Sequence, residues 1–319
     1  MAGDDPERSR QLTAWVIGAT GLLGSAVCRR LVAQGRELRT TEVPWNDPAA
    51  AVEALLRAAE QLPEGWEAYW CAGAGVVGSS QAELDAEIAV LEGFLSGWDP
   101  RPAGNGFFLA SSAGGVYAGA SGPPFTERTE PAPISAYGRA KLRSEEIVTE
   151  FAVRTSTALL VGRLANLYGP GQNLDKPQGL VSQLCLAQLT RQPVSVYVPL
   201  DTMRDYLFVD DAAAMAVASL GAVTKSGRRA LKVFASERST TVGAVLGDLH
   251  RVTRRRPPVV LGVSPRSRHQ VRDIRLRSVA WPRTKALART PMVSGIAATL
   301  ASLQRSAGRS QSPAQPGGR

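Results

Sequence analysis

Short apolar runs alternate with longer stretches of helical spacing along the first half of the chain. The apolar runs have the length and composition of buried strands, and the longer stretches carry apolar residues at every third or fourth position. The pattern predicts strands at residues 13–18, 37–43, 105–112 and 156–164, and a strand that runs into a glycine-rich turn within 66–75. It predicts helices at 25–35, 47–62, 82–98 and 136–154. Strands that alternate with helices in this way form parallel sheets covered by helices. The sequence therefore predicts an α/β fold with a doubly wound parallel sheet.

The regular alternation ends near residue 165, where prolines and glycines become frequent. We predict a first lobe over residues 12–165 and a smaller second lobe over residues 166–305, interleaved with the first. The polar residues 1–11 are expected to form a flexible leader. Residues 306–319 are rich in Ser, Gly and Pro and are expected to form a disordered tail. Two lobes suit a chain of 319 residues, which can bury a large core.

The net charge of +9 reflects arginines that concentrate toward the end of the chain, at 254–256 and between 266 and 277. Such a run is typical of a patch that binds nucleic acid or another anionic surface. It is equally typical of a solvated surface on which one or two arginines face an anionic substrate. We favour the second interpretation because no aromatic residues interleave with the arginines as stacking platforms for bases. Nucleic acid is therefore not an expected partner.

The N-terminus, the apolar runs and the cysteines indicate a cytoplasmic protein, and the histidine count bears on metal binding. The N-terminus is polar and acidic, unlike a signal peptide, and the longest apolar run, at 212–223, is too short to span a bilayer. We therefore expect no membrane association. Cys28, Cys71 and Cys185 match no zinc or redox spacing and are expected to be reduced thiols. With 2 histidines in the chain, no histidine-rich metal site is possible, and we expect no bound metal.

The segment GATGLLG at residues 18–24 connects the first predicted strand to the first predicted helix. Gly18 allows the tight turn, Gly21 lets the backbone approach a pyrophosphate, and Gly24 allows the helix to pack closely against the strand. The helix N-terminus offers free N–H groups and the positive end of its dipole to a phosphate. The glycine pattern in this strand–turn–helix context predicts that the first lobe binds a dinucleotide.

The second predicted strand bears on the choice of dinucleotide. Glu42 lies near its end, where a carboxylate is expected to hold the adenosine ribose hydroxyls of NAD. A carboxylate repels the 2′-phosphate of NADP, whereas the nearby Arg36 and Arg39 would attract it. We predict NAD as the cofactor, with NADP as the alternative.

Tyr137 and Lys141 lie four residues apart near the start of the predicted helix at 136–154. This spacing places both side chains on one face of the helix. An ammonium group near a phenol favours the phenolate, so the pair suits a tyrosine that acts as acid and base. Alone, such a pair is typical of a solvated surface. Together with the glycine-rich turn and a strand that ends in serines, it indicates a catalytic site.

These features resemble the extended short-chain dehydrogenases/reductases, and within them the NAD-dependent epimerase/dehydratase family that acts on nucleotide sugars. The resemblance covers residues 13–305. It rests on the stretches GATGLLG, SSAGGVY, SAYGRAKLRSEE, GRLANLYGPGQ and MRDYLFVDDAA. It implies an NAD(P)-dependent enzyme with a Rossmann-type first lobe and a C-terminal substrate-binding lobe. It also implies a homodimer and a UDP- or dTDP-linked sugar as the substrate.

The resemblance further implies roles for individual residues of the first lobe. Tyr137 is the acid/base, and Lys141 supports it and holds the nicotinamide ribose. Ser112 is our candidate for the catalytic hydroxyl. The implied cofactor contacts are Gly18, Thr20, Gly21, Leu22, Leu23, Gly24, Glu42, Cys71, Ala72, Gly73, Ala110, Tyr137, Lys141 and Leu164. The implied substrate contacts are Ser111, Ser112, Ala113, Asn166, Arg204 and Arg268.

Three of these substrate contacts concern phosphate. Asn166 and Arg204 resemble the family residues that contact the phosphates of the nucleotide sugar, and Arg268 or Arg272 is expected to add a second phosphate contact. The guanidinium fork of an arginine suits phosphate oxygens. An ion pair with Asp205 or Asp210 is the alternative for Arg204.

The sequence departs from the family pattern at the catalytic hydroxyl and on one helix. The catalytic Ser or Thr commonly lies three residues before the Val-Tyr pair, and here that position is Ala113. Ser111 and Ser112 are the available hydroxyls, and they are not equivalent because successive strand residues face opposite sides. We favour Ser112; the alternative is that both serines satisfy backbone groups. Glu87 or Ala89 stands where a helix asparagine is common.

Within the family, the sequence favours a nucleotide-sugar epimerase, because an epimerase retains NAD. The stretch AGG after the serines lacks the acidic pair of a 4,6-dehydratase. The alternative is an NADPH-dependent 4-ketoreductase of a dTDP- or UDP-4-keto-sugar, which would suit the arginines of the second strand. A catalytically silent cofactor-binding regulator or RNA-associated protein on the same fold is a second alternative. The displaced hydroxyl and the basic run motivate it, and the intact tyrosine–lysine pair counts against it.

Overall fold

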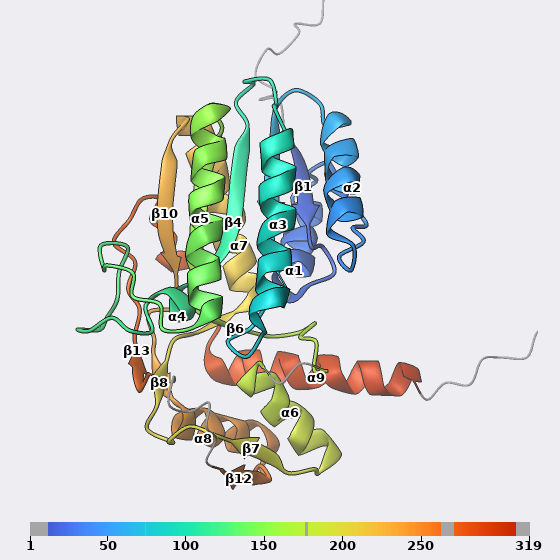
Figure 1. Cartoon of the computed structure of the whole chain (residues 1–319). Helices are drawn as coiled ribbons and strands as arrows, with labels where there is room; N and C mark the ends of the chain where they lie inside the picture. The colour runs from blue at the N-terminus through green and yellow to red at the C-terminus, as the bar shows by residue number, and fades with distance from the viewer. Residues whose placement is uncertain (1–11, 74, 176–177, 263–270, 311–319) are drawn as a thin grey trace, which may run out of the picture.

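A computed structural model of the chain describes residues 12–73, 75–175, 178–262 and 271–310. Within these residues the largest element is a six-stranded sheet of order β10-β5-β4-β3-β1-β2, with every neighbouring pair parallel (Figure 1). Its strands are β1 (Thr13–Ile17), β2 (Leu38–Thr40), β3 (Trp66–Trp70), β4 (Gly106–Ser112), β5 (Ala158–Leu164) and β10 (Arg229–Phe234). The chain adds β2 on one side of β1 and then β3 on the other, so the strand order reverses between β1 and β3.

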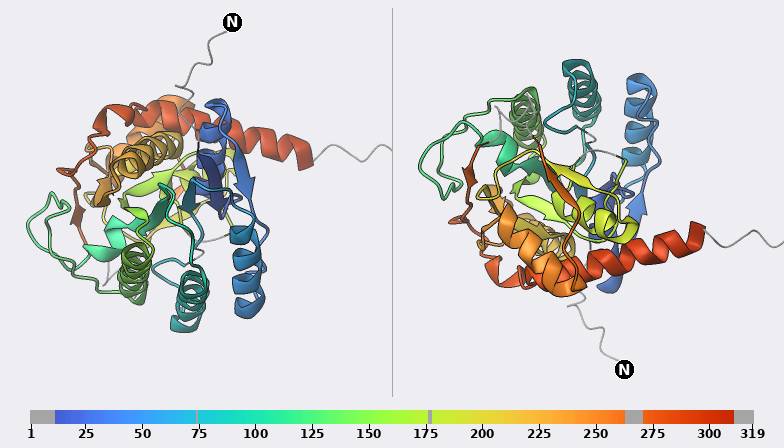
Figure 2. Two further views of the ribbon diagram at one scale, coloured as in Figure 1. Left: turned by 90° about the horizontal axis from the view of Figure 1, so that it is seen from above. Right: turned by 90° about the horizontal axis from the view of Figure 1, so that it is seen from below.

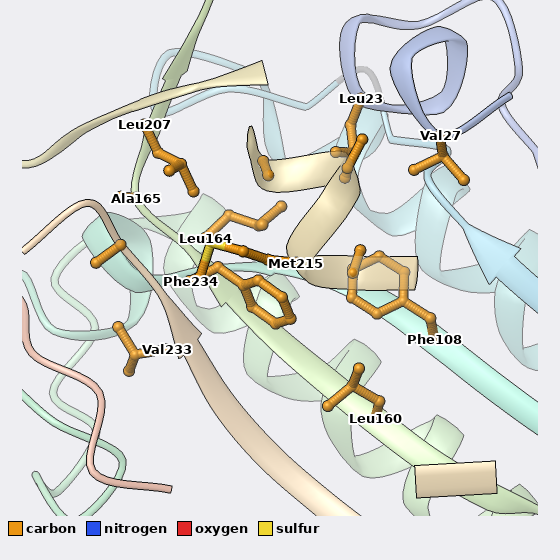
Figure 3. Close-up of a cluster of buried hydrophobic side chains, with 14 of the residues drawn as sticks. Leu23, Val27, Phe108, Leu160, Leu164, Ala165, Leu207, Met215, Val233 and Phe234 are labelled. Atoms are coloured by element: carbon orange, nitrogen blue, oxygen red, sulfur yellow. The ribbon is translucent and has the colours of Figure 1, made fainter. Parts of the chain in front are cut away.

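Helices cover both faces of this sheet. One face carries α1 (Leu22–Ala33) and α7 (Val209–Ser226); the other carries α2 (Pro48–Glu60), α3 (Gln81–Gly97) and α5 (Ala136–Arg154). On the first face, Leu23 of α1 and Met215 of α7 share a core with Phe108 and Leu160 of the sheet (Figure 3). Strands covered on both faces are apolar along their length, which explains the continuous apolar runs. The arrangement confirms the doubly wound α/β fold.

The predicted elements are present, with one strand shorter than expected. The helix predicted at 136–154 has those bounds in the structure, as α5. In place of the strand predicted at 37–43, β2 contains three residues. Two backbone hydrogen bonds turn the chain over residues 43–47, and the Asp47 carboxylate then accepts hydrogen bonds from the first turn of α2. The turn therefore begins before the predicted strand has ended.

The second half of the chain contributes to both parts of the molecule. Whereas α7 and β10 join the large sheet, α6 (Leu180–Thr190), α8 (Val242–Thr253) and α9 (Met292–Ser310) pack around a separate core beneath its carboxyl edge (Figure 1). The short helices are α4 (Ala113–Val116) and a 3-10 turn at Lys285–Leu287. The short strands pair as β6 (Asn166–Tyr168) with β9 (Tyr206–Phe208), β7 (Val194–Val196) with β12 (Val259–Leu261), and β8 (Met203–Arg204) with both β11 (Thr240–Thr241) and β13 (Asp273–Ile274).

The C-terminal helix α9 crosses beneath the sheet, and its end projects beyond the rest of the molecule (Figure 2). Ile296 and Leu300 of α9 are buried in the core that α6 and α8 share with it. Neither α9 nor any other described helix has the length and apolar content needed to cross a membrane.

Candidate active site

The glycine-rich turn lies at the carboxyl end of β1, where the strand order reverses. Gly18 has φ +81°, and a Cβ on it would lie 2.6 Å from the backbone nitrogen of Ala72. A Cβ on Gly24 would lie 2.1 Å from the carbonyl oxygen of Gly18. Both positions therefore require glycine for the turn to approach the loop after β3 and the first turn of α1. Ligands of open α/β sheets bind at such a reversal.

The N-terminus of α1 is open to an anion. Gly21 is its N-cap residue, with no side-chain cap, and the first turn contains no acidic side chain. The first N–H groups of a helix have no intrahelical partner, and they carry the positive end of the dipole. This end of α1 therefore fits the phosphates of a dinucleotide.

The structure places the predicted cofactor contacts around this turn, but not all by their side chains. Thr20 and Gly21 are exposed, and Cys71, Ala72 and Gly73 directly follow β3 beside Gly18. Burial raises the pKa of the Cys71 thiol well above its usual range. The side chains of Leu23 and Leu164 lie inside the core (Figure 3), so only their backbone atoms can face a ligand.

The charged residues of the second strand occupy different ends of it. Glu42 is exposed two residues beyond β2, on the carboxyl side. Arg36 instead donates to the Leu12 carbonyl at 2.6 Å and to the Glu67 carboxylate at 3.1 Å, at the amino end of the strands. Arg39 donates to the Gln61 carbonyl. The interpretation of these arginines as ligands of a 2′-phosphate is therefore wrong, because both point away from the carboxyl edge.

The first turns of α5 hold the tyrosine and the lysine on one face. Ser135 caps the helix by accepting from the Gly138 N–H at 3.1 Å. The Lys141 Nζ lies 5.5 Å from the centroid of the Tyr137 ring. A Cβ on Gly73 would lie 3.1 Å from that Nζ, so the ammonium group points to the loop after β3. The tyrosine and lysine therefore line the same edge as the glycine-rich turn.

Ser112 is the hydroxyl that the fold brings to this pair. It is the N-cap residue of α4 and accepts from the Gly115 N–H at 3.2 Å. A Cβ on Gly115 would lie 2.9 Å from Cε1 of Tyr137, so α4 packs directly against the tyrosine ring. Ser112 itself is half-buried. Its position on α4 is compatible with a hydroxyl that meets the same substrate oxygen as Tyr137.

Two neighbouring substrate contacts implied by the resemblance do not fit the structure. Ser111 is 3% exposed, and its hydroxyl donates to the Glu145 carboxylate at 2.5 Å. Ala113 is 0% exposed and belongs to the core. Because successive residues alternate across β4, the side chain of Ser111 points away from the side occupied by Ser112. Neither side chain is free to touch a substrate.

Asn166 lies beside α4, and Arg204 lies in β8. Asn166 is exposed, and a Cβ on Gly114 would lie 3.9 Å from its Oδ1. Arg204 is half-buried and donates to the Met203 carbonyl at 2.8 Å. Burial lowers the pKa of its guanidinium group. Arg268 lies outside the described residues.

The alternative partners proposed for Arg204 are engaged elsewhere. Asp205 is 1% exposed and accepts from the Ser236 N–H at 2.7 Å. Asp210 pairs with Arg29 at 2.6 Å. Among the described residues no ion pair includes Arg204, so the ion-pair alternative is wrong. A half-buried guanidinium group without a carboxylate partner suits an anionic ligand.

Two contacts near the site are not evident from the sequence, although Glu87 stands at a position where the family often has an asparagine. Glu87 of α3 accepts from the Gly75 N–H at 2.6 Å and reaches the loop after β3, near Lys141. Glu145 lies four residues after Lys141 and pairs with Arg163 at 2.7 Å inside the protein. The four-residue spacing from Lys141 indicates that Glu145 lies on the same face of α5. The sequence does not show its partner Arg163, which lies on β5, 18 residues away.

Comparison with known proteins supports the resemblance. The NAD dependent epimerase/dehydratase family matches residues 100–231. A dTDP-L-rhamnose 4-epimerase of Burkholderia thailandensis is 35% identical over 99 residues, which cover 31% of this chain and 27% of that protein. A probable low-salt glycan biosynthesis reductase of Haloferax volcanii is 28% identical over 278 residues, covering 79% of this chain and 90% of that protein.

A solved structure extends the comparison to the whole fold. UDP-glucose 4-epimerase from Bifidobacterium longum, in complex with NAD+ and UDP, superimposes with a TM-score of 0.75 over 92% of this chain and 98% of its own. Its sequence is 18% identical, so this likeness concerns the fold. The family match over residues 100–231 and the shared fold confirm the resemblance to the NAD-dependent epimerase/dehydratase family.

Proposed function

We propose that this protein is a cytoplasmic NAD-dependent epimerase of a UDP- or dTDP-linked sugar. The observation that carries the proposal is the placement of Tyr137, Lys141 and Ser112 at the edge where the glycine-rich turn also lies. Groups from α4, α5 and β1 converge there although they are far apart in the sequence. Such convergence of a titratable pair, a hydroxyl and an anion-binding turn is what an active site requires.

The residues present fit NAD. Gly18 and Gly24 leave a turn that any Cβ would fill, and the open end of α1 suits a pyrophosphate. Glu42 is exposed at the carboxyl end of β2, where it can accept from ribose hydroxyls. Lys141 reaches the loop after β3 and can hold the second ribose. When bound, NAD supplies the hydride acceptor and donor for a secondary alcohol.

Tyr137 is the proposed acid/base of this reaction. Oxidation of a sugar hydroxyl to a ketone releases a proton from the oxygen, and the Tyr137 phenolate accepts it. The Lys141 ammonium stabilises the phenolate, and the Ser112 hydroxyl donates a hydrogen bond to the substrate oxygen. On reduction from the opposite face of the ketone, Tyr137 returns the proton. The cycle inverts one carbon and consumes no external oxidant or reductant.

The nucleotide end of the substrate is assigned to Arg204 and Asn166. The guanidinium group of Arg204 is half-buried, and it is attracted by the charge of Asp273 but forms no ion pair with a described residue. The backbone N–H of Asn166 donates at 3.0 Å to the carbonyl of Asp205, the residue that follows Arg204, so the segments that carry Asn166 and Arg204 lie side by side. A diphosphate offers the negative charge that can pair with the Arg204 guanidinium group. Its oxygens can also accept hydrogen bonds from the Asn166 side-chain amide.

A second candidate function is reduction of a dTDP- or UDP-4-keto-sugar with NADPH. It is favoured by the named reductase relative, which covers 79% of this chain. The orientation of Arg36 and Arg39 counts against NADPH, because neither points to the carboxyl edge. We therefore place the epimerase first.

The deciding experiment is to denature the purified protein and identify the released nucleotide by mass. The epimerase proposal predicts NAD in the released fraction and conversion of a UDP- or dTDP-sugar without added cofactor. An empty protein that oxidises NADPH with a keto-sugar would favour the reductase. Absence of turnover with every sugar nucleotide, together with RNA or heparin binding that survives moderate salt, would favour the non-enzymatic alternative.

A further inference from the structure

A buried polar network lies directly behind the proposed catalytic residues. The Arg163 guanidinium donates to Glu145 from Nη2 at 2.7 Å and from Nε at 3.0 Å. Its Nη1 donates to the Tyr117 hydroxyl at 2.7 Å, and that hydroxyl donates to the Thr126 carbonyl at 2.9 Å. Glu145 also accepts from the Ser111 hydroxyl at 2.5 Å. The network joins β4, β5, α4 and α5 through side chains alone.

All four members are removed from solvent: the exposed fractions are 3% for Ser111, 0% for Tyr117, 9% for Glu145 and 4% for Arg163. Burial opposes the charge of Arg163, but the hydrogen bonds and charge of Glu145 outweigh it and raise the pKa of Arg163. A buried ion pair of this kind gives little net stability compared with apolar residues of the same volume. Its presence beside the proposed site therefore calls for an explanation other than stability.

Each member is adjacent to a part of the proposed site. Ser111 precedes Ser112, and Glu145 lies one helical turn after Lys141 on α5. Tyr117 is the C-cap residue of α4, and Ser112 is its N-cap residue. This four-residue helix touches the Tyr137 ring. A helix of one turn has little stability of its own. Its orientation therefore depends on what holds its two ends.

We infer that Ser111, Tyr117, Glu145 and Arg163 are positioning residues that fix Ser112 and α4 against the catalytic face of α5. Ser111 holds the residue before the helix, and Tyr117 holds the residue after it. Both are tied to Glu145 and Arg163, so α4 and the helix that carries Tyr137 and Lys141 move as one unit. The inference rests on the proposed function, in which the Ser112 hydroxyl and Tyr137 meet the same oxygen.

The test uses variants that remove one hydroxyl each, Ser111→Ala and Tyr117→Phe, because Glu145→Gln leaves a buried arginine unpaired and can unfold the protein. The control is Glu146→Gln, the next residue on α5, which is exposed and pairs with Arg143 at 3.2 Å. With a sugar nucleotide that the wild type converts, Ser111→Ala and Tyr117→Phe should lower kcat about tenfold to a hundredfold. Their KM should stay within about twofold of wild type. The control should stay within about twofold in both constants.

A double variant separates positioning from a general structural role. If Ser111 acts through Ser112, the variant Ser111→Ala/Ser112→Ala loses no more kcat than Ser112→Ala alone. Independent, multiplied losses would overturn the inference, and so would an unchanged kcat in Ser111→Ala.

Hydrogen exchange gives a reading that does not depend on turnover. Amides of residues 112–118 should exchange about tenfold faster in Ser111→Ala and Tyr117→Phe than in wild type or Glu146→Gln, with the remaining segments unchanged. Unchanged exchange in folded variants would overturn the inference. If no sugar nucleotide is converted by the wild type, the proposed function fails while the exchange result still decides whether the network holds α4.

Discussion

Charged side chains that we compare at the two ends of the large sheet differ in whether they form ion pairs. At the amino end, Glu67 accepts from Arg36 at 3.1 Å and from the Tyr69 hydroxyl at 2.9 Å. At the carboxyl end and beyond it, Lys141 and Arg204 are half-buried, and neither forms an ion pair with any described residue. A cation that leaves water without a partner costs free energy. The pairing of Arg36 with Glu67 thus stabilises the amino end, whereas Lys141 and Arg204 are two cations that an anionic ligand could neutralise.

The largest expected effect concerns the carboxyl end. Tyr137→Phe removes the hydroxyl that exchanges the proton, and turnover should fall by about 10³-fold. Binding of NAD, followed by calorimetry, should remain within about threefold of wild type, because the phenol is not a phosphate contact. Turnover equal to that of wild type would contradict the mechanism proposed for this end.

The amino end should respond in stability alone. Arg36→Met leaves the buried Glu67 carboxylate without its ion-pair partner, so the free energy of unfolding should fall by about 3 kcal/mol. Urea denaturation measures this change. The KM for NAD, determined on the folded variant, should not change, since Arg36 points away from the carboxyl edge. A selective loss of NADP binding would instead restore Arg36 as a cofactor ligand.

In contrast to Arg36→Met, Arg204→Met should change the KM without lowering the stability. The KM for the sugar nucleotide should rise about thirtyfold, which is the loss of one charge-assisted hydrogen-bonded contact. The free energy of unfolding should rise by about 1 kcal/mol, because a half-buried charge has been removed. Arg251→Met serves as the control, since Arg251 is exposed and pairs with Asp248 at 2.8 Å. A loss of stability in Arg204→Met would mean that the arginine has a structural partner.

The smallest effect concerns Asp205, the buried neighbour of Arg204. Burial raises the pKa of its carboxyl group, and one carboxyl oxygen, Oδ2, has no hydrogen-bond partner. The folded state therefore binds the proton more tightly than the unfolded state. The stability gained from this tighter proton binding is fully present below the pKa of the carboxyl group in the unfolded state. It is lost as the pH rises through the raised pKa of the folded state. Asp205→Asn should gain about 1 kcal/mol relative to wild type as the pH rises from the ordinary range of an aspartate carboxyl toward neutrality.

Denaturation of both proteins across that pH range measures the difference. A constant difference would show that Asp205 titrates alike in the folded and unfolded states.

The sequence predicted the elements whose signals are local. The caps of α2 and α5 and the turn at Gly18 follow from neighbouring residues, and these elements lie where expected. The strand β2 was overestimated because Val43 suits a strand, whereas the turn is set by the residues that follow it.

The directions of side chains were harder to predict. Arg36 and Glu42 flank one strand, and the sequence alone does not show that their side chains lie at its opposite ends. Arg204 and Asp205 are neighbours of opposite charge, yet they alternate along the extended chain and do not pair. Which of Ser111 and Ser112 reaches the site likewise depended on Glu145, a residue 34 positions from Ser111 along the chain.

The exchange of segments between the lobes has a consequence for modularity. A fragment that ended at residue 165 would lack α7 and β10, leaving β5 as an unpaired edge and Phe108 and Leu160 without part of their cover. Such a fragment is not an autonomous folding unit. Grafting the part of one relative that corresponds to α6, α8 and α9 onto the large-sheet part of another would therefore need several crossovers rather than one. Divergence of substrate choice within this architecture is correspondingly expected to proceed through loops and single side chains.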